Sequence, residues 1–115
     1  MRLERLRAVA LGLPHTTVVK QWGENLVFKV EGKVFFLVSL DGELADGVTV
    51  KCRPDEFDAL TEIDGIGQAP YFAKRHWVHV ADLGALPAAE LERLIRHSFD
   101  LVVGQLPKKV QAALK

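Results

Sequence analysis

Basic and aromatic side chains are concentrated in one stretch of this chain, from Pro70 to Val80. It reads Pro-Tyr-Phe-Ala-Lys-Arg-His-Trp-Val-His-Val and holds no acidic residue, although acids and bases are mixed elsewhere. Such a surface can hold a phosphate backbone with its cations and stack nucleobases on its rings. In one continuous strand, alternate side chains share a face. One face would hold Tyr71, Arg75, Trp77 and His79, and the other would hold Phe72, Lys74, His76, Val78 and Val80.

The same stretch has a second interpretation, as an ordinary strand whose Trp77 packs against a helix while Lys74 and Arg75 are solvated. Tryptophan is more often a core or interface residue than a platform for bases. Both interpretations remain open at this point. For the nucleic-acid interpretation, the candidate binding residues are Lys33, Lys51, Tyr71, Lys74, Arg75, His76, Trp77, Lys108 and Lys109.

Other kinds of site find little support in the residue pattern. Side chains three apart on a strand face opposite sides, so His76 and His79 would not chelate one ion together. Cys52 is the only cysteine, which excludes an internal disulfide and a cysteine zinc cluster. It shares a predicted strand face with Val48 and Val50, which indicates a buried, unreactive thiol. We expect no catalytic residues, no metal site and no cofactor, and therefore a protein that is not an enzyme.

Composition limits the strength of any interaction with nucleic acid. The 115 residues include 15 basic and 15 acidic ones, for a net charge of zero, whereas strong nonspecific binders usually have a basic excess. The length predicts a single domain spanning residues 1–115. The first residues do not form a signal peptide, and no apolar run is long enough to cross a membrane. A lone thiol fits a reducing compartment, so we expect a cytoplasmic protein without a membrane partner.

Hydrophobic periodicity predicts three helices and four or five strands. The helices are expected over residues 2–12, from Pro54 to about residue 64, and from about Pro87 to Gly104. Strands are expected as a hairpin over residues 25–40, over residues 48–52, and as one or two strands within residues 71–80. Ser98 lies on the apolar face of the last helix and is expected to bond its own helix backbone. The order α-β-β-β-α-β-(β)-α predicts an α+β fold with two layers, an antiparallel sheet with flanking helices.

The predicted hairpin turns at Glu31-Gly32, which pairs Val30 with Lys33, Phe28 with Phe35, and Leu26 with Leu37. Both faces of this hairpin are then largely apolar. A sheet that is apolar on both faces needs two covers, either helices on both sides or a partner subunit on one side.

Several short motifs, in order, resemble the MmcQ/YjbR-like family of small proteins. The resemblance runs from Leu13 to Lys109, and one departure is Phe99, where the family more often has tyrosine. It implies a CyaY-like (frataxin-like) fold and a DNA-binding role with a double-wing arrangement of strands. The matching residues are Leu13-Pro14, Thr16-Thr17, Trp22-Gly23, Phe28-Lys29-Val30, Gly32-Lys33-Val34-Phe35, Lys51, Pro54, Pro70-Tyr71, His76-Trp77, Ser98-Phe99-Asp100-Leu101-Val102 and Leu106-Pro107-Lys108-Lys109.

Two functional hypotheses follow. In the first, the protein binds DNA weakly and without sequence specificity, with Lys33, Lys74 and Arg75 on phosphates and Tyr71 and Trp77 stacking or wedging. Lys51, Lys108 and Lys109 would extend the basic track. In the second, the protein is an interaction module, a homodimer or an adaptor for a protein partner, which uses the apolar hairpin face and has no role with nucleic acid.

Overall fold

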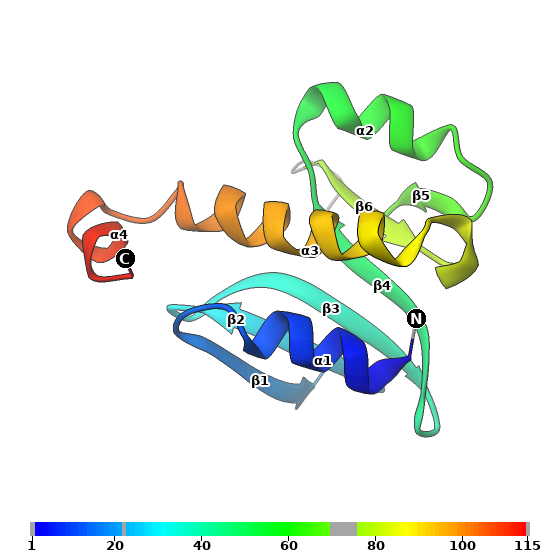
Figure 1. The fold of residues 1–115 in the computed structure, drawn as a ribbon, viewed down its shortest axis with the longest axis horizontal. Coiled ribbons are helices and arrows are strands. Elements are labelled where there is room, and N and C mark those ends of the chain that lie inside the picture. Colours follow the sequence, from blue (N-terminus) through cyan, green and yellow to red (C-terminus); the bar gives the residue numbers. More distant parts are fainter. Residues whose placement is uncertain (1, 22, 70–75, 115) are drawn as a thin grey trace.

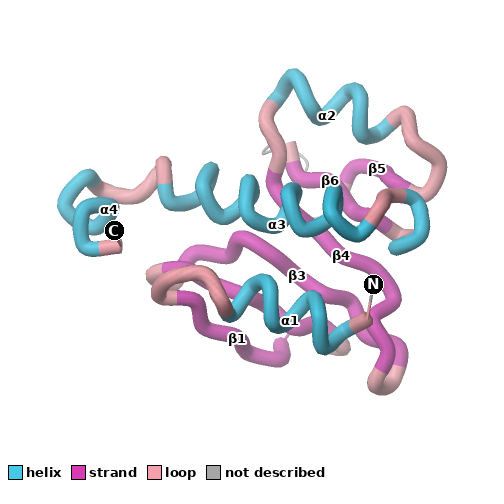
Figure 2. Tube along the Cα trace, in the orientation of Figure 1, coloured by secondary structure: helices cyan, strands magenta, loops and turns pink. Residues whose placement is uncertain are grey.

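An antiparallel sheet and a layer of helices form the two layers of the fold in the computed structural model (Figures 1 and 2). The structure describes residues 2–21, 23–69 and 76–114. The strand order in the sheet is β1-β2-β3-β4-β6-β5, and every neighbouring pair is antiparallel. The elements are α1 (Leu3–Leu11), β1 (Thr16–Gln21), β2 (Asn25–Val30), β3 (Lys33–Asp41), β4 (Leu44–Lys51), α2 (Pro54–Thr61), β5 (Ile66–Gln68), β6 (Trp77–Val80), η2 (Leu83–Ala85), α3 (Ala88–Val103) and α4 (Lys108–Ala113).

The predicted α+β class and the three predicted helices are confirmed, while two strands, one α-helix and the short 3₁₀-helix η2 were not predicted. Pro54 begins α2 because a helix leaves its first N–H groups unbonded, and proline has none to lose there. The missed elements are β1, β5, η2 and α4. In β1, polar residues outnumber the two valines, and β5 is three residues long with a central glycine, so neither has a clear apolar period.

The turn between β2 and β3 lies where the sequence predicts it, but the pairing beyond it differs. Glu31 and Gly32 both have positive φ, at 50° and 77°, as a type I′ hairpin turn requires. Val30 pairs with Lys33 as expected. A β-bulge then shifts the register, so Phe28 pairs with Phe36, and not with Phe35 as predicted. Likewise Leu26 pairs with Val38, and the predicted pairing with Leu37 is wrong.

The bulge places two consecutive phenylalanines, Phe35 and Phe36, in the core on the helix side of the sheet. Phe36 stacks on Phe28 with ring centroids 5.1 Å apart, and Phe35 meets Phe99 of α3 edge-on at 5.3 Å. Leu37 consequently faces the opposite side of the sheet, where it packs in a small cluster with Val27 and Trp77. The departure to phenylalanine at position 99 therefore fits a buried aromatic contact that needs no hydroxyl.

Ser98 of α3 joins the bulge to β4. Its hydroxyl donates to the Phe35 carbonyl at 2.6 Å and accepts the backbone N–H of Lys51 at 2.9 Å. The expected bond of Ser98 to its own helix is therefore replaced by a bridge between two strands. The pairing of β3 with β4 extends from the pair Asp41 and Leu44 to the pair Phe36 and Val50. The Ser98 hydroxyl therefore bonds backbone groups that lie just beyond the last pair of this ladder.

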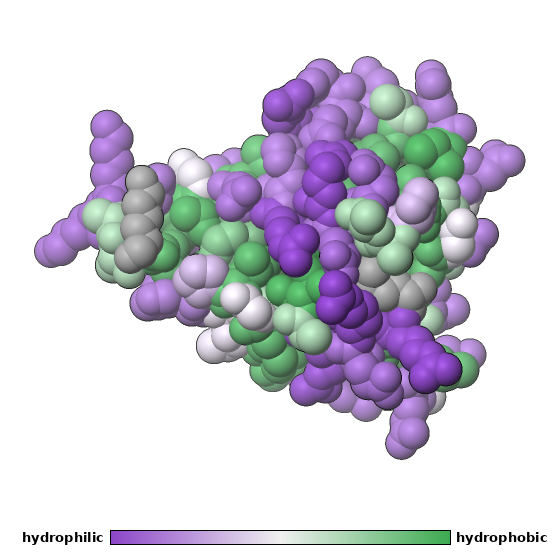
Figure 3. Space-filling model, in the orientation of Figure 1, coloured by the Kyte–Doolittle hydropathy of each residue, from purple (hydrophilic) through white to green (hydrophobic). Residues whose placement is uncertain are grey.

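Helices α1, α2 and α3 contact one face of the sheet, and α3 runs between α1 and α2 above it (Figure 1). Their solvent side is largely hydrophilic (Figure 3). The main core includes Leu6 of α1, Leu60 of α2 and Leu94 of α3 together with the inward side chains of the strands. On the opposite face, a smaller cluster of Val27, Leu37, Ala69 and Trp77 is also buried, although it includes no residue of a described helix. The expectation of apolar residues on both faces is thus confirmed.

We predict that Ser98→Ala lowers the free energy of unfolding by about 1–3 kcal/mol, because two buried backbone groups lose their partner. Urea unfolding followed by circular dichroism measures this change. The matched control is Thr61→Ala, which removes a hydroxyl that bonds a carbonyl of its own helix, that of Phe57, at 2.9 Å. Equal losses in the two variants would contradict a bridging role for Ser98.

Candidate nucleic-acid interface

The side of the sheet opposite the helices is called here the outer sheet face. Val48, Val50, Val78 and Val80 belong to the main core on the helix side. Strand side chains alternate, so the residues between them point to the other side. The outer sheet face therefore carries Val27 and Lys29 of β2, Leu37 of β3, Thr49 and Lys51 of β4, and Trp77 and His79 of β6.

Trp77 lies on this face but is only 6% exposed. It packs with Val27, Leu37 and Ala69, with Val34 alongside. Trp77 is therefore a packing residue, as the second interpretation has it, but the predicted packing against a helix is wrong, because its neighbours lie on the face opposite the helices. A ring this deeply buried offers little surface on which a base can stack, so the remaining candidate contacts are cationic.

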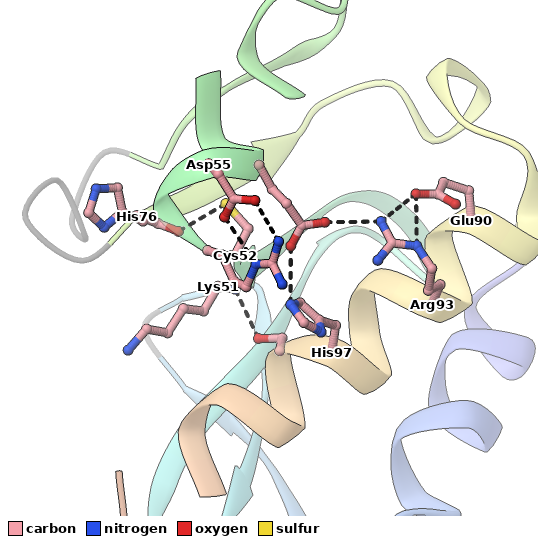
Figure 4. Close-up of polar contacts among 10 residues, drawn as sticks. Lys51, Cys52, Asp55, His76, Glu90, Arg93 and His97 are labelled. Carbon is pink, nitrogen blue, oxygen red and sulfur yellow. Dashed lines mark hydrogen bonds and ion pairs between the residues drawn. The ribbon is translucent and has the colours of Figure 1, made fainter. Parts of the chain in front are cut away.

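Three lysines gather at one end of the sheet, where β2 and β4 end and β3 begins. Lys29 lies opposite Val34, next to the β2–β3 turn, and Lys33 is the first residue of β3. Lys51 is the last residue of β4 and lies opposite Trp77. In Figure 4 its side chain extends away from the helix-side polar groups. Lys29 and Lys33 form no ion pair with another described residue. We call these three lysines the cationic end.

The remaining predicted residues of the basic stretch flank or fall outside this region. Tyr71, Lys74 and Arg75 lie outside the described residues. The chain enters that segment after Ala69, whose N–H bonds the Trp77 carbonyl at 3.0 Å, and leaves it at His76, so both its ends are at the cationic end. His76 is exposed and has a positive φ of 55°, a conformation uncommon for a residue with a side chain. Its ring meets Phe57 of α2 edge-on.

Lys108 and Lys109 are exposed but lie elsewhere. They begin α4, which lies beyond the C-terminal end of α3 and away from β6 (Figure 1). The structure therefore does not bring them onto the outer sheet face with Lys51.

Acidic residues collect at the opposite end of the sheet. The turns and strand ends there follow β1, β3 and β6 and precede β4 and β5. Asp46, at a bulge of β4, borders the outer sheet face close to His79. Charge is therefore separated along the strand direction. The acids at this end are Glu24, Asp41, Glu43, Asp46, Asp64 and Asp82.

Two acids near the cationic end, Glu31 and Asp55, contact bases. Glu31 in the β2–β3 turn contacts Nδ1 of His15 at 3.0 Å. At the start of α2, Arg53 donates to Asp55 at 3.0 Å, and this hydrogen bond lowers the pKa of the Asp55 carboxyl. Of these two acids, Asp55 therefore has a cationic partner, Arg53.

Glu56 forms the centre of a helix-side group that ties α2 to α3 (Figure 4). Its carboxylate accepts from Arg93 at 3.2 Å and lies 3.1 Å from Nε2 of His97. Arg93 also bonds Glu90, which raises the pKa of the guanidinium and lowers that of Glu90. These contacts tie the two helices together, although Glu56 Oε1 and His97 Nε2 have no hydrogen-bond partner among the described residues, and they give Glu56 and Glu90 a structural role.

A polar pair on the outer sheet face was not predicted. Thr49 Oγ1 lies 3.0 Å from Nδ1 of His79, directly across the β4–β6 ladder. The imidazole lies over Gly47, where a Cβ atom would come within 3.0 Å of the ring. Burial is the main cause that lowers the pKa of His79, and Asp46 acts in the opposite direction. The sequence shows a histidine in a strand but gives no sign that a threonine far along the chain faces it.

Cys52 is 1% exposed, and burial is the main cause that raises its pKa to about 11. Its thiol donates to the His76 carbonyl at 3.3 Å. The expected burial of the thiol is confirmed, and its raised pKa favours the protonated form over the nucleophilic thiolate. Among the residues that the structure describes, no group of three or more metal-ligating side chains comes together, and no helix is long and apolar enough to span a bilayer.

Comparison with known proteins identifies the family. The chain matches the YjbR family model over residues 11–101, so it belongs to the YjbR family, as its motifs predict. It is 29% identical over 116 residues to the uncharacterized protein YbdF of Escherichia coli O157:H7, covering 97% of this chain and 93% of that protein.

Two crystal structures are similar to this one. DR2400 of Deinococcus radiodurans, which contains a DUF419 domain, has a TM-score of 0.86 and 28% identity over 97% of this chain and 86% of that one. A protein from Pseudomonas syringae has a TM-score of 0.69 and 25% identity over 88% of this chain and 98% of that one. The α+β fold is therefore shared with solved relatives.

We predict that Trp77→Ala lowers the free energy of unfolding by about 3–5 kcal/mol, because it leaves a cavity among buried neighbours. Trp77→Phe is the milder variant and should lose less, since an aromatic ring still fills part of the space. Thermal and urea unfolding measure both. A nearly unchanged stability in Trp77→Ala would show that the ring is not a core residue.

We also predict that stability falls as the pH drops below about 6.5, the ordinary pKa of histidine in an unfolded chain. The folded-state pKa of His79 is lowered, so between the two values the unfolded chain binds more protons. The contribution of neutral His79 to the free energy of unfolding is fully present above the pKa that it has in the unfolded chain. It is lost as the pH falls through the lower pKa that it has in the folded protein. Urea unfolding from pH 5 to 8 should show a weaker pH dependence in His79→Asn, whereas the exposed control His76→Asn should keep it.

Proposed function

We propose that this protein binds nucleic acid weakly and without sequence specificity, through contacts of the cationic end with phosphates. The observation that carries the proposal is the separation of charge along the strands, because Lys29, Lys33 and Lys51 share one end while most of the acids in the strand connections collect at the other. A local cationic surface attracts a polyanion even when the net charge of the protein is zero.

The burial of Trp77 changes the predicted mode of binding. With this ring packed against Val27 and Leu37, binding relies on phosphate contacts more than on stacking. Phosphate contacts position a protein on a nucleic acid but carry no sequence information. Lys74 and Arg75 lie outside the described residues, so their part in this proposal rests on the sequence alone. The proposed role is binding, without catalysis.

The test is fluorescence anisotropy of labelled duplex and single-stranded oligonucleotides, titrated at several salt concentrations. The informative variant is the double change Lys29→Ala with Lys51→Ala. The matched control is Lys108→Ala with Lys109→Ala, which removes the same charge from α4. We expect the first pair to weaken binding and reduce the slope of log K against log salt by about two, and the control to change both less.

Two results would overturn the proposal. One is the absence of binding at low salt. The other is an equal loss in both double variants, which would indicate a response to net charge alone. Lys74→Ala and Arg75→Ala test the extension of the surface, and unchanged affinity in both would limit the site to the described strands.

The alternative, a protein-interaction module that uses the hairpin face, is less well supported. Val27 and Leu37 on the outer sheet face are 0% and 6% exposed, so they already lack the accessible apolar area that such an interface needs.

A further inference from the structure

The two edges of the sheet differ in how well they are protected. An edge strand exposes unpaired backbone groups, and proteins usually shield it by making it short or by adding bulges, prolines or charges. At one edge, β5 is only three residues long. At the other edge, β1 has six residues, Thr16–Gln21, and pairs with β2 without a register shift. It contains no proline, and its one charged residue, Lys20, is neutralised by Glu24 at 3.1 Å.

Exposed apolar side chains lie beside this open edge. Val19 of β1 is 44% exposed, on the outer sheet face opposite Val27. Leu11, at the end of the helix that packs on β1, is 41% exposed. Among the described residues, only one other large apolar side chain is exposed, Leu44 in the β3–β4 turn region. The β1 edge thus combines free backbone groups with apolar surface.

We propose that β1 is a homodimer interface, where it pairs antiparallel with β1 of a second copy to give one continuous sheet. A two-fold axis perpendicular to the sheet keeps both helix layers on one side. With this axis, residues that lie directly opposite each other must point to the same face of the sheet. One residue of β1 therefore lies opposite its own copy in the second chain, with the axis between the two copies. An axis at Val19 places the exposed valines of the two copies against each other.

The register set by this axis is self-complementary. Thr17 lies opposite Gln21 of the second copy, and Val18 lies opposite Lys20 of the second copy. Like charges are not directly opposed, and β1 has no acid to bury. A second copy therefore suits this strand in backbone pairing, apolar contact and charge. This proposal is independent of nucleic-acid binding, because it uses the β1 edge and not the cationic end.

Sedimentation equilibrium of the wild-type protein over micromolar to submillimolar concentrations tests the dimer. We expect a concentration-dependent mass that approaches twice that of the monomer. Val19→Lys places like charges opposite each other and should raise the dissociation constant about tenfold or more. The matched control is Leu44→Lys, which adds the same charge at a side chain that is 72% exposed away from β1, and it should leave the dimer intact.

Oxidative cross-linking of Val19→Cys provides a second measurement and tests the register. Cys52 should not compete, because it is buried and its pKa is raised to about 11. We expect a disulfide-linked dimer from Val19→Cys and only background from Leu44→Cys. A wild-type protein that stays monomeric throughout overturns the proposal and points to a strand from another protein as the occupant. A dimer that survives Val19→Lys, with no cross-link at position 19, places the interface elsewhere and also overturns it.

Discussion

The hydroxyl of Ser98 is the contact on which the arrangement of the sheet depends. It bonds the Phe35 carbonyl and the Lys51 N–H just where the β3–β4 ladder ends, and so holds the bulge in place. The bulge decides which face of the sheet each later residue of β3 points to. Without the bulge, Leu37 would face the helices and Phe36 would face outward. Because the same hydroxyl accepts the N–H of Lys51, it also fixes the position of this residue at the end of β4. One buried hydroxyl thus links the packing of α3 to the surface proposed to bind phosphates.

The charge pattern follows from the topology more than from composition. In a sheet of antiparallel strands joined by short turns, all connections fall at two ends, and each end collects the polar residues of its own turns. Acidic turns gather at one end, whereas Lys29, Lys33 and Lys51 gather at the other. Of the acids at the cationic end, Asp55 is paired with Arg53, and Glu31 contacts the imidazole of His15. A chain of zero net charge can therefore present a cationic surface.

The sequence predicts what depends on local pattern and misses what depends on distant contacts. The Glu31-Gly32 turn and the start of α2 at Pro54 are local, and both are confirmed. The bulge is not local in this sense, because Phe35 and Phe36 are equally apolar and the pattern fits either register. The Ser98 bridge spans 63 residues to Phe35, and the Thr49–His79 pair spans 30, so no spacing rule finds them. Trp77 was left undecided because a strand pattern does not say which face is covered.

The two proposed surfaces fit together geometrically. A two-fold axis through Val19 would turn both outer sheet faces to the same side and point the two cationic ends in opposite directions. With strands about 4.8 Å apart and about 3.3 Å per residue, the two copies of Lys29 would then lie roughly 20 Å apart. A nucleic-acid duplex has its own two-fold symmetry, so the two copies of Lys29 and Lys51 on the outer sheet face could meet equivalent phosphates on its two strands. In the proposed dimer each copy would contribute weak contacts, and their linkage would raise the effective concentration of the second contact once the first has formed. A chain of zero net charge would gain most from this arrangement, because its charge alone gives a single copy little affinity.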